Sequence, residues 1–421
     1  MSIAGGRHAM GGQQFGEGTI LVDTCALDRV VAFDACRGLV TVEAGIQWPA
    51  LLSALAQLQI GRARPWGIYQ KQTGADRLSL GGALACNAHG RGLAMKPIVD
   101  QIEAFDLVDA RGDVLTCSRQ AHPELFRLAI GGYGLFGVIA RVTMRLQPRF
   151  KVRRVVELGE TTDIMARFED RIRAGFVYGD FQFAIDSAHD TFLKHGVFPC
   201  YEPASDDTPL TEQPRCFSCD DWARLTIDAH VNKSRAFEFY AARYLETSGQ
   251  IYWADEQLAG SYVDDYHADV DRAIGSAVKG TEMITEVFFP RAQLASFMSA
   301  AARELRCRNA NVIYGTVRLI EPDEETFLAW ARDRYACIVF NLHVDHTASA
   351  IASAAETFRA LIDLAIAHDG SYYLTYHRWA RQDQVERCYP QMREFLLAKR
   401  RYDPAEVFQS EWYRHYRWMF S

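Results

Sequence analysis

The sequence predicts an α+β fold, and three observations support this prediction. Residues 1–148 alternate short apolar runs with glycine turns, which is typical of short strands. From about residue 150 to 370, glycine becomes rarer and longer strand-like and helix-like segments follow one another without strict alternation. Hydrophobic residues make up 49% and charged residues 24% of the 421 positions, a globular balance with enough chain for two or three structural units.

The first 148 residues are predicted to form a series of short elements closed by Pro148. The expected strands cover residues 19–23, 39–45 and 138–146, and a hairpin is expected over residues 102–116 with its turn at 109–113. Helices are expected at residues 48–58, where Pro49 suits the first turn, and at 124–130. Residues 1–4 resemble the end of a strand followed at once by glycines. We therefore expect strands of this domain to be missing before residue 1, with a naturally short N-terminus as the alternative.

The middle of the chain is predicted to form a second α+β unit. Its expected strands cover residues 181–185, 282–289, 311–320 and 335–344. Its expected helices cover residues 236–246, 291–305, 324–332 and 348–368. The polar, proline-bearing stretch 197–221 is expected to be a loop, and residues 372–421 form a tail rich in aromatic residues and arginine.

Charge and cysteine content exclude several classes of protein. The net charge is 46 − 53 = −7, with a sequence pI near 6.0, which argues against a nucleic-acid partner. No uncharged apolar stretch reaches about 18 residues, so we expect no membrane span. The ten cysteines are dispersed and no signal peptide is evident, so we expect reduced thiols and a cytoplasmic protein. Cys216 and Cys219 form one C-x2-C pair without a second pair nearby, so no metal site is expected.

Three glycine clusters dominate the first unit. They read GGRHAMGGQ at residues 5–13, SLGGALACNAHGRG at 79–92 and IGGYGLFGV at 130–138. Glycine allows close approach of backbone to a ligand, and successive amides can bind an anion. Each loop alone is best interpreted as a tight turn, but three on one domain indicate a long phosphate-bearing cofactor. The G-x-G-x-x-G at 132–137 follows a helix and precedes a strand, which is the wrong context for a Rossmann turn.

These motifs resemble those of vanillyl-alcohol-oxidase-type (PCMH-type) FAD-binding flavoproteins, nearest to alditol oxidases, decaprenylphosphoryl-ribose oxidases and cytokinin dehydrogenases. Residues 8–13 (HAMGGQ) resemble the H-S-x-x-G-Q loop, 81–90 the G-G-x-x-A-x-x-x-H-G loop and 131–138 the G-G-x-G-x-x-G-V/I turn. Residues 402–404 and 408 resemble the C-terminal K-x-x-Y-D-P-x-x-x-F motif. The resemblance implies an N-terminally truncated PCMH-type FAD-binding domain of two α+β subdomains at 1–148, an α+β cap at 149–371, and a segment at 372–421 that returns to the FAD domain.

The resemblance implies FAD as cofactor and assigns the residues that bind it. His8 matches the histidine that carries the flavin covalently in such enzymes, and the alternative is a histidine that only hydrogen-bonds a phosphate or backbone. Cys86 is interpreted as a small packed residue in the second loop. The expected cofactor-binding residues are Gly5, Gly6, Arg7, His8, Ala9, Gly12, Gln13, Ser79, Gly81, Gly82, Cys86, Asn87, His89, Gly90, Gly132, Gly134, Gly137 and Val138.

Two predicted strands carry polar stripes that are candidates for the floor of a substrate pocket. Strand alternation places Tyr314, Thr316 and Arg318 on one face, and Asn341 and His343 on one face of the other strand. Two solvent-facing strands are the alternative. In alditol oxidases an E-x-R strand and a following F-H-F-T contact flavin and substrate. Here Arg318 matches the arginine, Thr316 replaces the glutamate, and Asn341 and His343 replace the histidine and threonine.

The family tail places a basic residue near flavin N5, which makes Tyr376 and His377 the proton-transfer candidates. The alternative for His377 is a histidine packed among aromatic residues. Glu286, in a segment resembling the E-x-x-x-P-R strand of the cap, is expected to be mainly structural.

The predicted function is FAD-dependent oxidation of a hydroxylated carbon in a sugar, polyol or lactone-like small molecule, with hydride transfer to flavin N5. The electron acceptor is dioxygen or another molecule, and the oligomeric state is open. A flavin-dependent C=C reductase of the same fold and a degenerate FAD-binding or interaction protein without turnover are the two alternatives.

Overall fold

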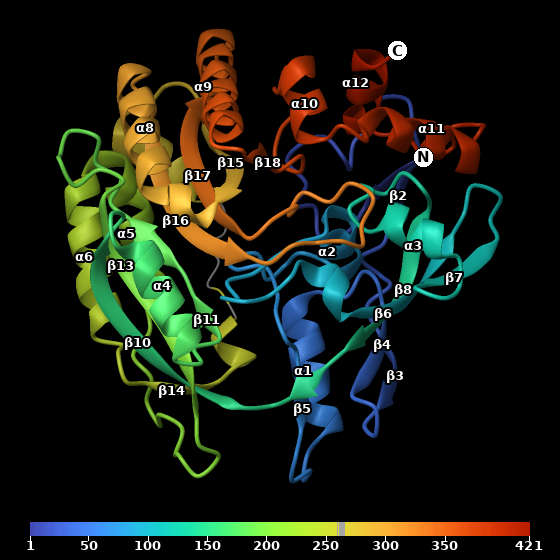
Figure 1. Cartoon of the computed structure of the whole chain (residues 1–421), viewed down its shortest axis with the longest axis horizontal. Coiled ribbons are helices and arrows are strands. Elements are labelled where there is room, and N and C mark those ends of the chain that lie inside the picture. Colours follow the sequence, from blue (N-terminus) through green and yellow to red (C-terminus); the bar gives the residue numbers. More distant parts are fainter. Residues whose placement is uncertain (259, 261–265) are drawn as a thin grey trace.

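The computed structural model describes residues 1–258, 260 and 266–421, and its fold is α+β. Within these residues, two large sheets organise the chain. A five-stranded sheet belongs to the N-terminal region, and a nine-stranded, mainly antiparallel sheet belongs to the middle of the chain. The two sheets lie beside each other, and in Figure 1 the C-terminal helices, in red, lie at the top right above the N-terminal region.

The N-terminal sheet has the strand order β3-β4-β8-β6-β7. Its strands are β3 (Val30–Asp34), β4 (Leu39–Glu43), β6 (Ile102–Val108), β7 (Val114–Ser118) and β8 (Val138–Arg145). The helices of this region are α1 (Trp48–Leu58), α2 (Leu80–Cys86) and α3 (Pro123–Ala129), with a 3-10 turn at Ile98–Gln101. The predicted helix at 48–58 and the predicted hairpin are confirmed, because Trp48, Leu51 and Leu55 face the core and β6 pairs with β7.

Two smaller sheets complete the N-terminal region. Strands β1 (Ser2–Ala4) and β2 (Leu21–Asp23) pair in parallel, and β5 (Trp66–Gly67) pairs with β9 (Gln147–Pro148). The glycine loop at residues 5–13 therefore leaves β1 directly and returns to β2 beside it.

The large sheet has the order β14-β10-β13-β12-β16-β17-β15-β18, with β11 paired to β13. Its strands are β10 (Lys151–Glu160), β11 (Tyr178–Gly179), β12 (Phe181–Phe183), β13 (His195–Ala204), β14 (Ile251–Trp253), β15 (Gly280–Pro290), β16 (Val312–Ile320), β17 (Tyr335–Asp345) and β18 (Ser371–Tyr372). Its helices are α4 (Ile164–Arg173), α5 (Cys219–Val231), α6 (Lys233–Leu245), α7 (His267–Ile274), α8 (Leu294–Cys307) and α9 (Ala348–Ala367). All four predicted strands are confirmed.

The two faces of the large sheet have different partners near β15. Phe289 stacks on Phe297 of α8 with ring centroids 4.1 Å apart, so this face packs against helices. Phe288, one residue earlier, stacks on Trp330 and approaches His89 of the N-terminal region, with centroids at 4.6 and 6.4 Å. Because alternate strand residues point to opposite faces, Thr285 and Val287 belong to the helix-covered face, whereas residues 282, 284 and 286 point the other way.

The predicted helix at 324–332 is wrong, because this segment consists of turns whose backbone bonds go elsewhere. The Asp323 carboxylate accepts the amides of residues 325 and 326, and the Phe327 amide donates to the Arg127 carbonyl. These tertiary bonds replace the i to i−4 bonds of a helix, which local periodicity alone cannot reveal.

The predicted loop at 197–221 is also wrong in its first part. Strand β13 pairs with β10 over ten residues and buries Val197, Phe198 and Tyr201. Pro199 and Pro203 lie inside this strand, which is why the segment resembled a loop. A true loop follows only until α5, where Ser218 and Asp221 form a capping box.

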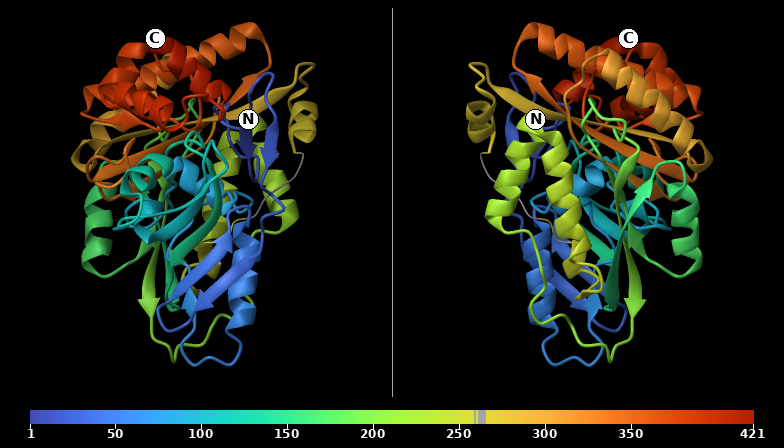
Figure 2. Two further views of the ribbon diagram at one scale, coloured as in Figure 1. Left: turned by 90° about the vertical axis from the view of Figure 1, so that its right-hand side faces the viewer. Right: turned by 90° about the vertical axis from the view of Figure 1, so that its left-hand side faces the viewer.

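The C-terminal segment folds as three helices against the N-terminal region. They are α10 (Gln382–Cys388), α11 (Met392–Tyr402) and α12 (Glu411–Met419). Trp412 stacks on Tyr133 with ring centroids 4.5 Å apart, and the Gln409 amide donates to the Met1 carbonyl at 2.7 Å. Figure 2 shows these red helices above the dark-blue N-terminal strands from both sides. None of the helices in the described part of the chain has both the length and the apolar character needed to cross a bilayer.

Candidate functional site

A cavity of about 480 Å³ lies between the glycine loops and the large sheet. Many of the residues that the sequence singled out line it: Gly5, Gly6, Arg7, His8, Ala9, Gln13, Ser79, Gly81, Gly82, Cys86, His89, Gly134, Gly137, Arg318, Asn341 and Tyr376. The chain therefore brings three loops and two strands, separated by up to about 370 positions, around one space.

Ser79 joins the first two glycine loops. As the N-cap of α2, its Oγ accepts the amide of Gly82 at 3.3 Å and also that of Gly6 at 3.4 Å. A Cβ at Gly6 would lie 2.0 Å from the Arg77 carbonyl oxygen, and one at Gly5 would lie 2.1 Å from Ser79 Oγ. Only glycine permits this approach of the two loops.

The third loop rests on the C-terminal end of α2. The amides of Gly131 and Tyr133 each donate at 2.9 Å to carbonyls of that helix, those of Leu84 and Ala85. Tyr133 has a φ of +55°, a conformation that favours glycine, and its stacking on Trp412 holds it there. The loop thus depends on the C-terminal helices for its shape.

Five of the expected cofactor-binding residues lie near the cavity without lining it: Gly12, Asn87, Gly90, Gly132 and Val138. Asn87 is fully buried and caps α2 with a left-handed backbone. Its side chain donates to Asp323 Oδ2 at 2.8 Å and accepts the Val99 amide at 3.2 Å. The geometry gives Asn87 a structural role that joins the loop to the segment after β16.

One face of the large sheet forms the floor of the cavity. Direct pairing across β16, β17 and β15 sets Tyr314, Asn341 and Ile284 in one row. Thr316, Val339 and Glu286 form the next row, and Arg318, Cys337 and Phe288 the third. The two polar stripes predicted from alternation are therefore neighbours on one buried face, and Glu286 belongs to the same face.

Several polar groups on this floor lack protein partners. In the described part of the chain, Arg318 Nε and Asn341 Oδ1 are buried without a hydrogen bond, as are the oxygens of Gln72 and Thr73 on the facing loop. All four residues line the cavity. In the described part of the chain, no carboxylate lies within ion-pair distance of Arg318. The negative charges of Glu286 and Asp180 act on it from farther away. Buried polar groups without protein partners are typical of a site that binds a polar ligand.

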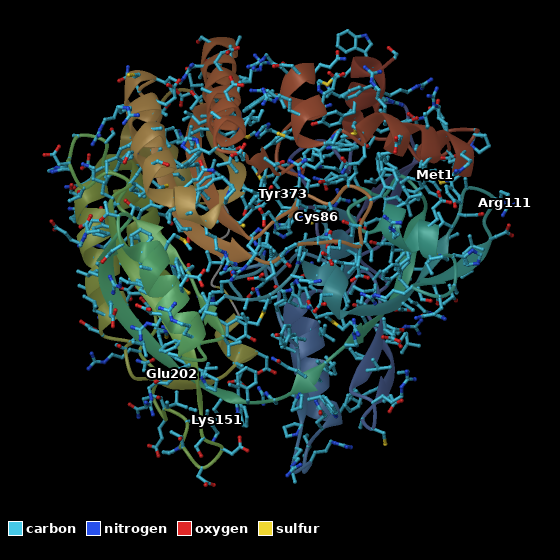
Figure 3. All side chains as sticks on the ribbon, viewed as in Figure 1. Met1, Cys86, Arg111, Lys151, Glu202 and Tyr373 are labelled. Carbon is cyan, nitrogen blue, oxygen red and sulfur yellow. The ribbon has the colours of Figure 1, made fainter. Side chains whose placement is uncertain are left out.

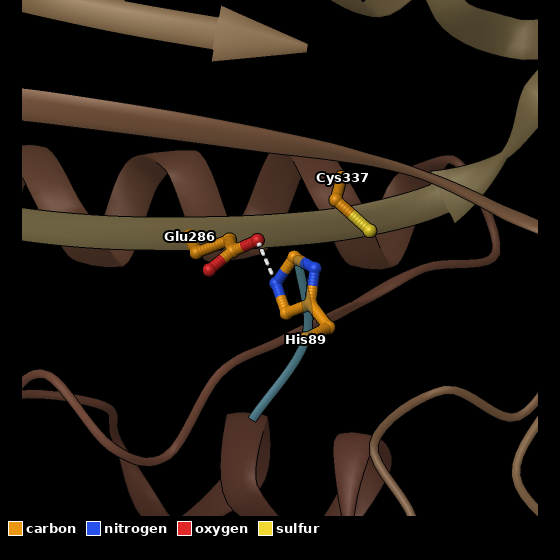
Figure 4. Close-up of side chains that lie close together, drawn as sticks. All are labelled: His89, Glu286 and Cys337. Atoms are coloured by element: carbon orange, nitrogen blue, oxygen red, sulfur yellow. Dashed lines mark hydrogen bonds and ion pairs between the residues drawn. The ribbon is translucent and has the colours of Figure 1, made fainter. Parts of the chain in front are cut away.

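His89 and Glu286 form a buried ion pair at the cavity wall, shown in Figure 4. His89 Nε2 lies 2.7 Å from Glu286 Oε1, and His89 Nδ1 lies 3.2 Å from the Gly90 carbonyl. Both ring nitrogens therefore face oxygen acceptors, one on the sheet and one on the loop. The second oxygen of Glu286 is buried and has no hydrogen-bond partner among the described residues. A contact between residues 197 positions apart has no local signal, so the sequence alone does not place Glu286 beside His89.

Tyr373 and Tyr376 close the cavity from the segment after β18. The Tyr373 hydroxyl donates to the Cys86 carbonyl at 2.6 Å, and Figure 3 shows these two residues together at the centre of the molecule. Burial and the nearby Glu286 charge raise the pKa of the Tyr376 phenol well above its usual value, so it stays protonated at neutral pH. Burial also raises the pKa of the Cys86 thiol to about 11, consistent with a packed, unreactive side chain.

His377 does not line the cavity. Its Nε2 lies 3.0 Å from Thr285 Oγ1, and Thr285 belongs to the helix-covered face of β15. The ring packs against Phe358 of α9 and Trp379, with centroids at 4.9 and 5.6 Å. Burial, with a smaller effect of Arg359, lowers the pKa of His377 to about 3. The structure thus separates His377 from the cavity by the sheet itself, and Tyr376 is the candidate that reaches it.

His343 lies one row beyond the cavity floor. Its Nδ1 is 3.1 Å from Glu282 Oε1, and it does not line the cavity. His8, in contrast, lines the cavity and is half-buried; burial and the charge of Arg77 lower its pKa, so its ring is neutral at neutral pH.

Comparison with known proteins identifies the N-terminal region. Residues 1–118 match the family model of the FAD binding domain. This N-terminal region is an FAD-binding domain of the PCMH-type oxidoreductase family. This flavoprotein is 25% identical over 406 residues to an L-gulono-1,4-lactone dehydrogenase of Mycobacterium tuberculosis, covering 94% of this chain and 85% of the relative.

Other relatives match this flavoprotein in a shorter stretch. Cytokinin dehydrogenase 2 of Arabidopsis thaliana is 34% identical over 147 residues, 35% of this chain and 28% of the relative. The mitochondrial L-galactono-1,4-lactone dehydrogenase of the same plant is 31% identical over 132 residues, 31% of this chain and 20% of the relative.

The residues present fit FAD. Three glycine loops surround the cavity, and unpartnered polar groups of Gln72, Thr73, Arg318 and Asn341 lie in its walls. Backbone amides of glycine loops bind pyrophosphate, and side-chain amide, hydroxyl and guanidinium groups can bond the polar edge of a flavin. The flavoprotein is therefore an FAD-linked oxidoreductase in which the large sheet faces the cofactor cavity.

Proposed function

We propose that this flavoprotein oxidises the CH–OH group of a small sugar, polyol or lactone and passes the electrons to dioxygen or another acceptor. One observation carries the proposal. Arg318, Asn341 and Tyr376, all suited to a hydroxylated substrate, line the same cavity as the glycine loops. The lactone dehydrogenases among the relatives support a substrate of this class.

Three successive segments of the chain have different roles. We assign cofactor binding to residues 1–148, the substrate-facing sheet to a cap at 149–371, and closure of the cavity to residues 372–421. In support, Tyr373, Thr375 and Tyr376 of the last segment line the cavity together with loop residues of the first.

FAD, when bound, accepts the hydride from the substrate carbon. The chain must then take up the hydroxyl proton, and Tyr376 with Glu286 provides a path for it. A phenol with a raised pKa is a poor final acceptor, but it can accept a proton from the substrate while its own proton moves to a carboxylate. Glu286 Oε2 is buried and unpartnered, while His89 holds Oε1 at 2.7 Å and fixes the carboxylate.

Arg318 supplies the positive charge of the site. A substrate hydroxyl becomes more negative as it loses its proton, and a buried guanidinium without a bonded carboxylate stabilises that charge strongly. On the same face of the sheet, the side-chain amide of Asn341 offers an oxygen and an NH2 group that can orient further hydroxyl groups of the substrate.

We further propose that His8 carries FAD covalently. Its neutral ring at the cavity wall supports this role. Acid precipitation of the purified protein separates non-covalently bound flavin from covalently linked flavin. Yellow colour is expected in the pellet, and the variant His8→Ala is expected to release it into the supernatant. Colour in the supernatant of the unchanged protein would contradict the covalent link while leaving the oxidase or dehydrogenase proposal intact.

The function is tested by mixing the yellow protein anaerobically with L-gulono-1,4-lactone, L-galactono-1,4-lactone and polyols. Bleaching near 450 nm by at least one of them, followed by reoxidation with dioxygen or a dye acceptor, is expected. If none bleaches the flavin, and an enoyl substrate instead reoxidises chemically reduced protein, the protein is a C=C reductase and our proposal is wrong. A protein that binds no FAD would also refute it.

The proton path is tested with Tyr376→Phe. Because a positioned proton-transfer group contributes about 10²–10⁴-fold, kcat should fall at least about 100-fold while flavin content is kept. Tyr389→Phe is the matched control, since this buried tyrosine donates to the Tyr372 carbonyl and does not line the cavity. Equal losses in both variants would remove Tyr376 from the mechanism.

A further inference from the structure

Three histidines converge on one carboxylate beside the cofactor cavity. His230 Nε2 and His343 Nδ1 each lie 3.1 Å from Glu282 Oε1, and His267 Nδ1 lies 3.0 Å from Glu282 Oε2. The side chains of His230, Glu282 and His343 are 1%, 5% and 5% exposed. Among the described residues, all ion-pair partners of Glu282 are histidines, so no lysine or arginine neutralises it.

The tautomer of His230 is set by its other nitrogen. His230 Nδ1 lies 2.8 Å from the Thr226 carbonyl of the same helix, and a carbonyl can only accept. Nδ1 therefore carries the proton, which leaves a lone pair on Nε2 of a neutral ring. That lone pair points at a carboxylate oxygen 3.1 Å away, and two acceptors at this distance require a cation between them. The cation is either a second ring proton or a metal ion.

The surroundings suit a metal ion. A ring nitrogen bound to a backbone carbonyl is the usual outer contact of a metal-ligating histidine, because it fixes the tautomer and ring orientation. The ligand atoms of His230, Glu282 and His343 all lie within 4.8 Å of one another. Asp271 Oδ1, on the same helix as His267, is buried with no hydrogen-bond partner among the described residues. This oxygen adds negative charge near the histidines, which attracts a cation to the cluster.

The backbone also makes room for this cluster. A Cβ at Gly280 would lie 2.2 Å from His343 Cε1 and 2.4 Å from its Nε2. Any other residue at the start of β15 would displace the imidazole, so glycine here preserves the position of the ring. The Tyr266 hydroxyl, in turn, donates to Glu282 Oε2 at 2.6 Å and holds the carboxylate from the cavity side.

We propose that His230, Glu282 and His343 bind a divalent transition metal, with Zn²⁺ as the best match and His267 as a fourth ligand after a small adjustment. Two or three imidazole nitrogens with one carboxylate oxygen form a typical zinc donor set, whereas Mg²⁺ and Ca²⁺ prefer all-oxygen sites. The ion would tie α5 and α7 to β15 and β17. It would lie one row beyond Asn341 and Ile284 of the cavity floor, and Tyr266 would connect the two sites.

This site is independent of the proposed oxidation, because its test measures metal binding and not turnover. The protein is produced without a polyhistidine tag in the variant Cys216→Ser/Cys219→Ser, which removes the exposed C-x2-C pair as a competing ligand. After treatment with a chelator, the FAD-loaded chain is titrated with Zn²⁺ against a chromophoric competitor. We expect one ion per chain, bound more tightly than 1 μM, and an increase in Tm on addition of Zn²⁺.

His230→Gln and His343→Gln should each weaken Zn²⁺ binding at least 100-fold, since each removes a ligand. The matched control is His195→Gln, because His195 forms a comparable pair with Glu160 at 2.8 Å but lies in another part of the sheet. Retained flavin absorbance shows that each variant has folded. Binding weaker than 10 μM in the starting protein, or equal weakening by His195→Gln, would overturn the proposal.

Discussion

The buried position of His377 predicts a measurable pH dependence of stability. The folded protein keeps this ring neutral, with a pKa of about 3, whereas the ordinary value is 6.5. The backbone amide of Trp379 donates to Nδ1 of His377 at 3.4 Å, and Nε2 of the same ring bonds Thr285 Oγ1. Only the neutral ring satisfies this pattern. A proton on Nδ1 would face an N–H group inside an aromatic pocket.

The sign follows from proton binding in the two states. Below pH 6.5 the unfolded chain binds a proton at His377 that the folded chain does not, so stability is full above pH 6.5 and falls as the pH drops towards about 3. The slope approaches about 1.4 kcal/mol per pH unit, which gives a loss of about 2 kcal/mol between pH 7.5 and 5. Removing the ring should remove this part of the pH dependence.

Urea unfolding of the holoprotein at pH 7.5 and pH 5, for the natural chain and for His377→Gln, measures this difference. The variant should lose some stability at pH 7.5 but should show a pH dependence smaller by about 2 kcal/mol. The half-buried His195→Gln serves as control, since the ring of His195 is partly solvated. An unchanged pH dependence in His377→Gln would refute the reasoning. A large loss of kcat with unchanged stability would instead restore His377 as a proton-transfer group.

Three further predictions follow from single contacts. Gly6→Ala should weaken FAD binding at least about tenfold, because its Cβ would lie 2.0 Å from the Arg77 carbonyl. Gly61→Ala has nothing within 4 Å and, at a φ of +80°, strains only its own exposed turn, so it should leave FAD affinity unchanged as measured by fluorescence titration. Asn87→Ala should cost about 3 kcal/mol in urea unfolding, through left-handed strain, the lost bond to Asp323 and a buried Val99 amide left without its acceptor, yet at low temperature it should still bind FAD; loss of FAD with normal stability would restore Asn87 as a cofactor ligand. Lys399→Met should cost about 3–5 kcal/mol, because it leaves Asp403 buried without its cation, and the double variant with Asp403→Asn should recover part of this loss; a single variant as stable as the natural chain would show that the buried pair contributes nothing.

Much of the fold could be predicted where the sequence has a clear period. The helix at Trp48–Leu58 and the hairpin of β6 and β7 were located from local patterns, because apolar spacing and turn residues determine them. The alternation that placed Arg318 and Asn341 on strand faces also held, since side-chain direction along a strand is a local property. Residues 324–332 failed because tertiary hydrogen bonds replaced the helix that their composition favours.

The site could be predicted only as far as its loops. The glycine clusters are evident from composition, so the sequence locates the loops that bring His8 and Ser79 to the cavity. The pairing of His89 with Glu286 required knowledge of which sheet face turns towards the loops. The sequence also could not show that His377 lies away from the cavity, because adjacent residues 376 and 377 reach opposite sides of β15 and no periodicity describes that irregular segment.

The contact between the two ends of the chain has a consequence for synthesis on the ribosome. The Glu411 amide donates to the Phe15 carbonyl at 2.6 Å, and Gln13 Nε2 donates to the Thr375 carbonyl at 2.8 Å. The loop that carries His8 therefore lacks these supports until residues beyond 410 have left the exit tunnel. Flavin capture then becomes one of the last events in maturation, and a ribosome that stalls before α12 would release a chain that is folded in its sheets but colourless.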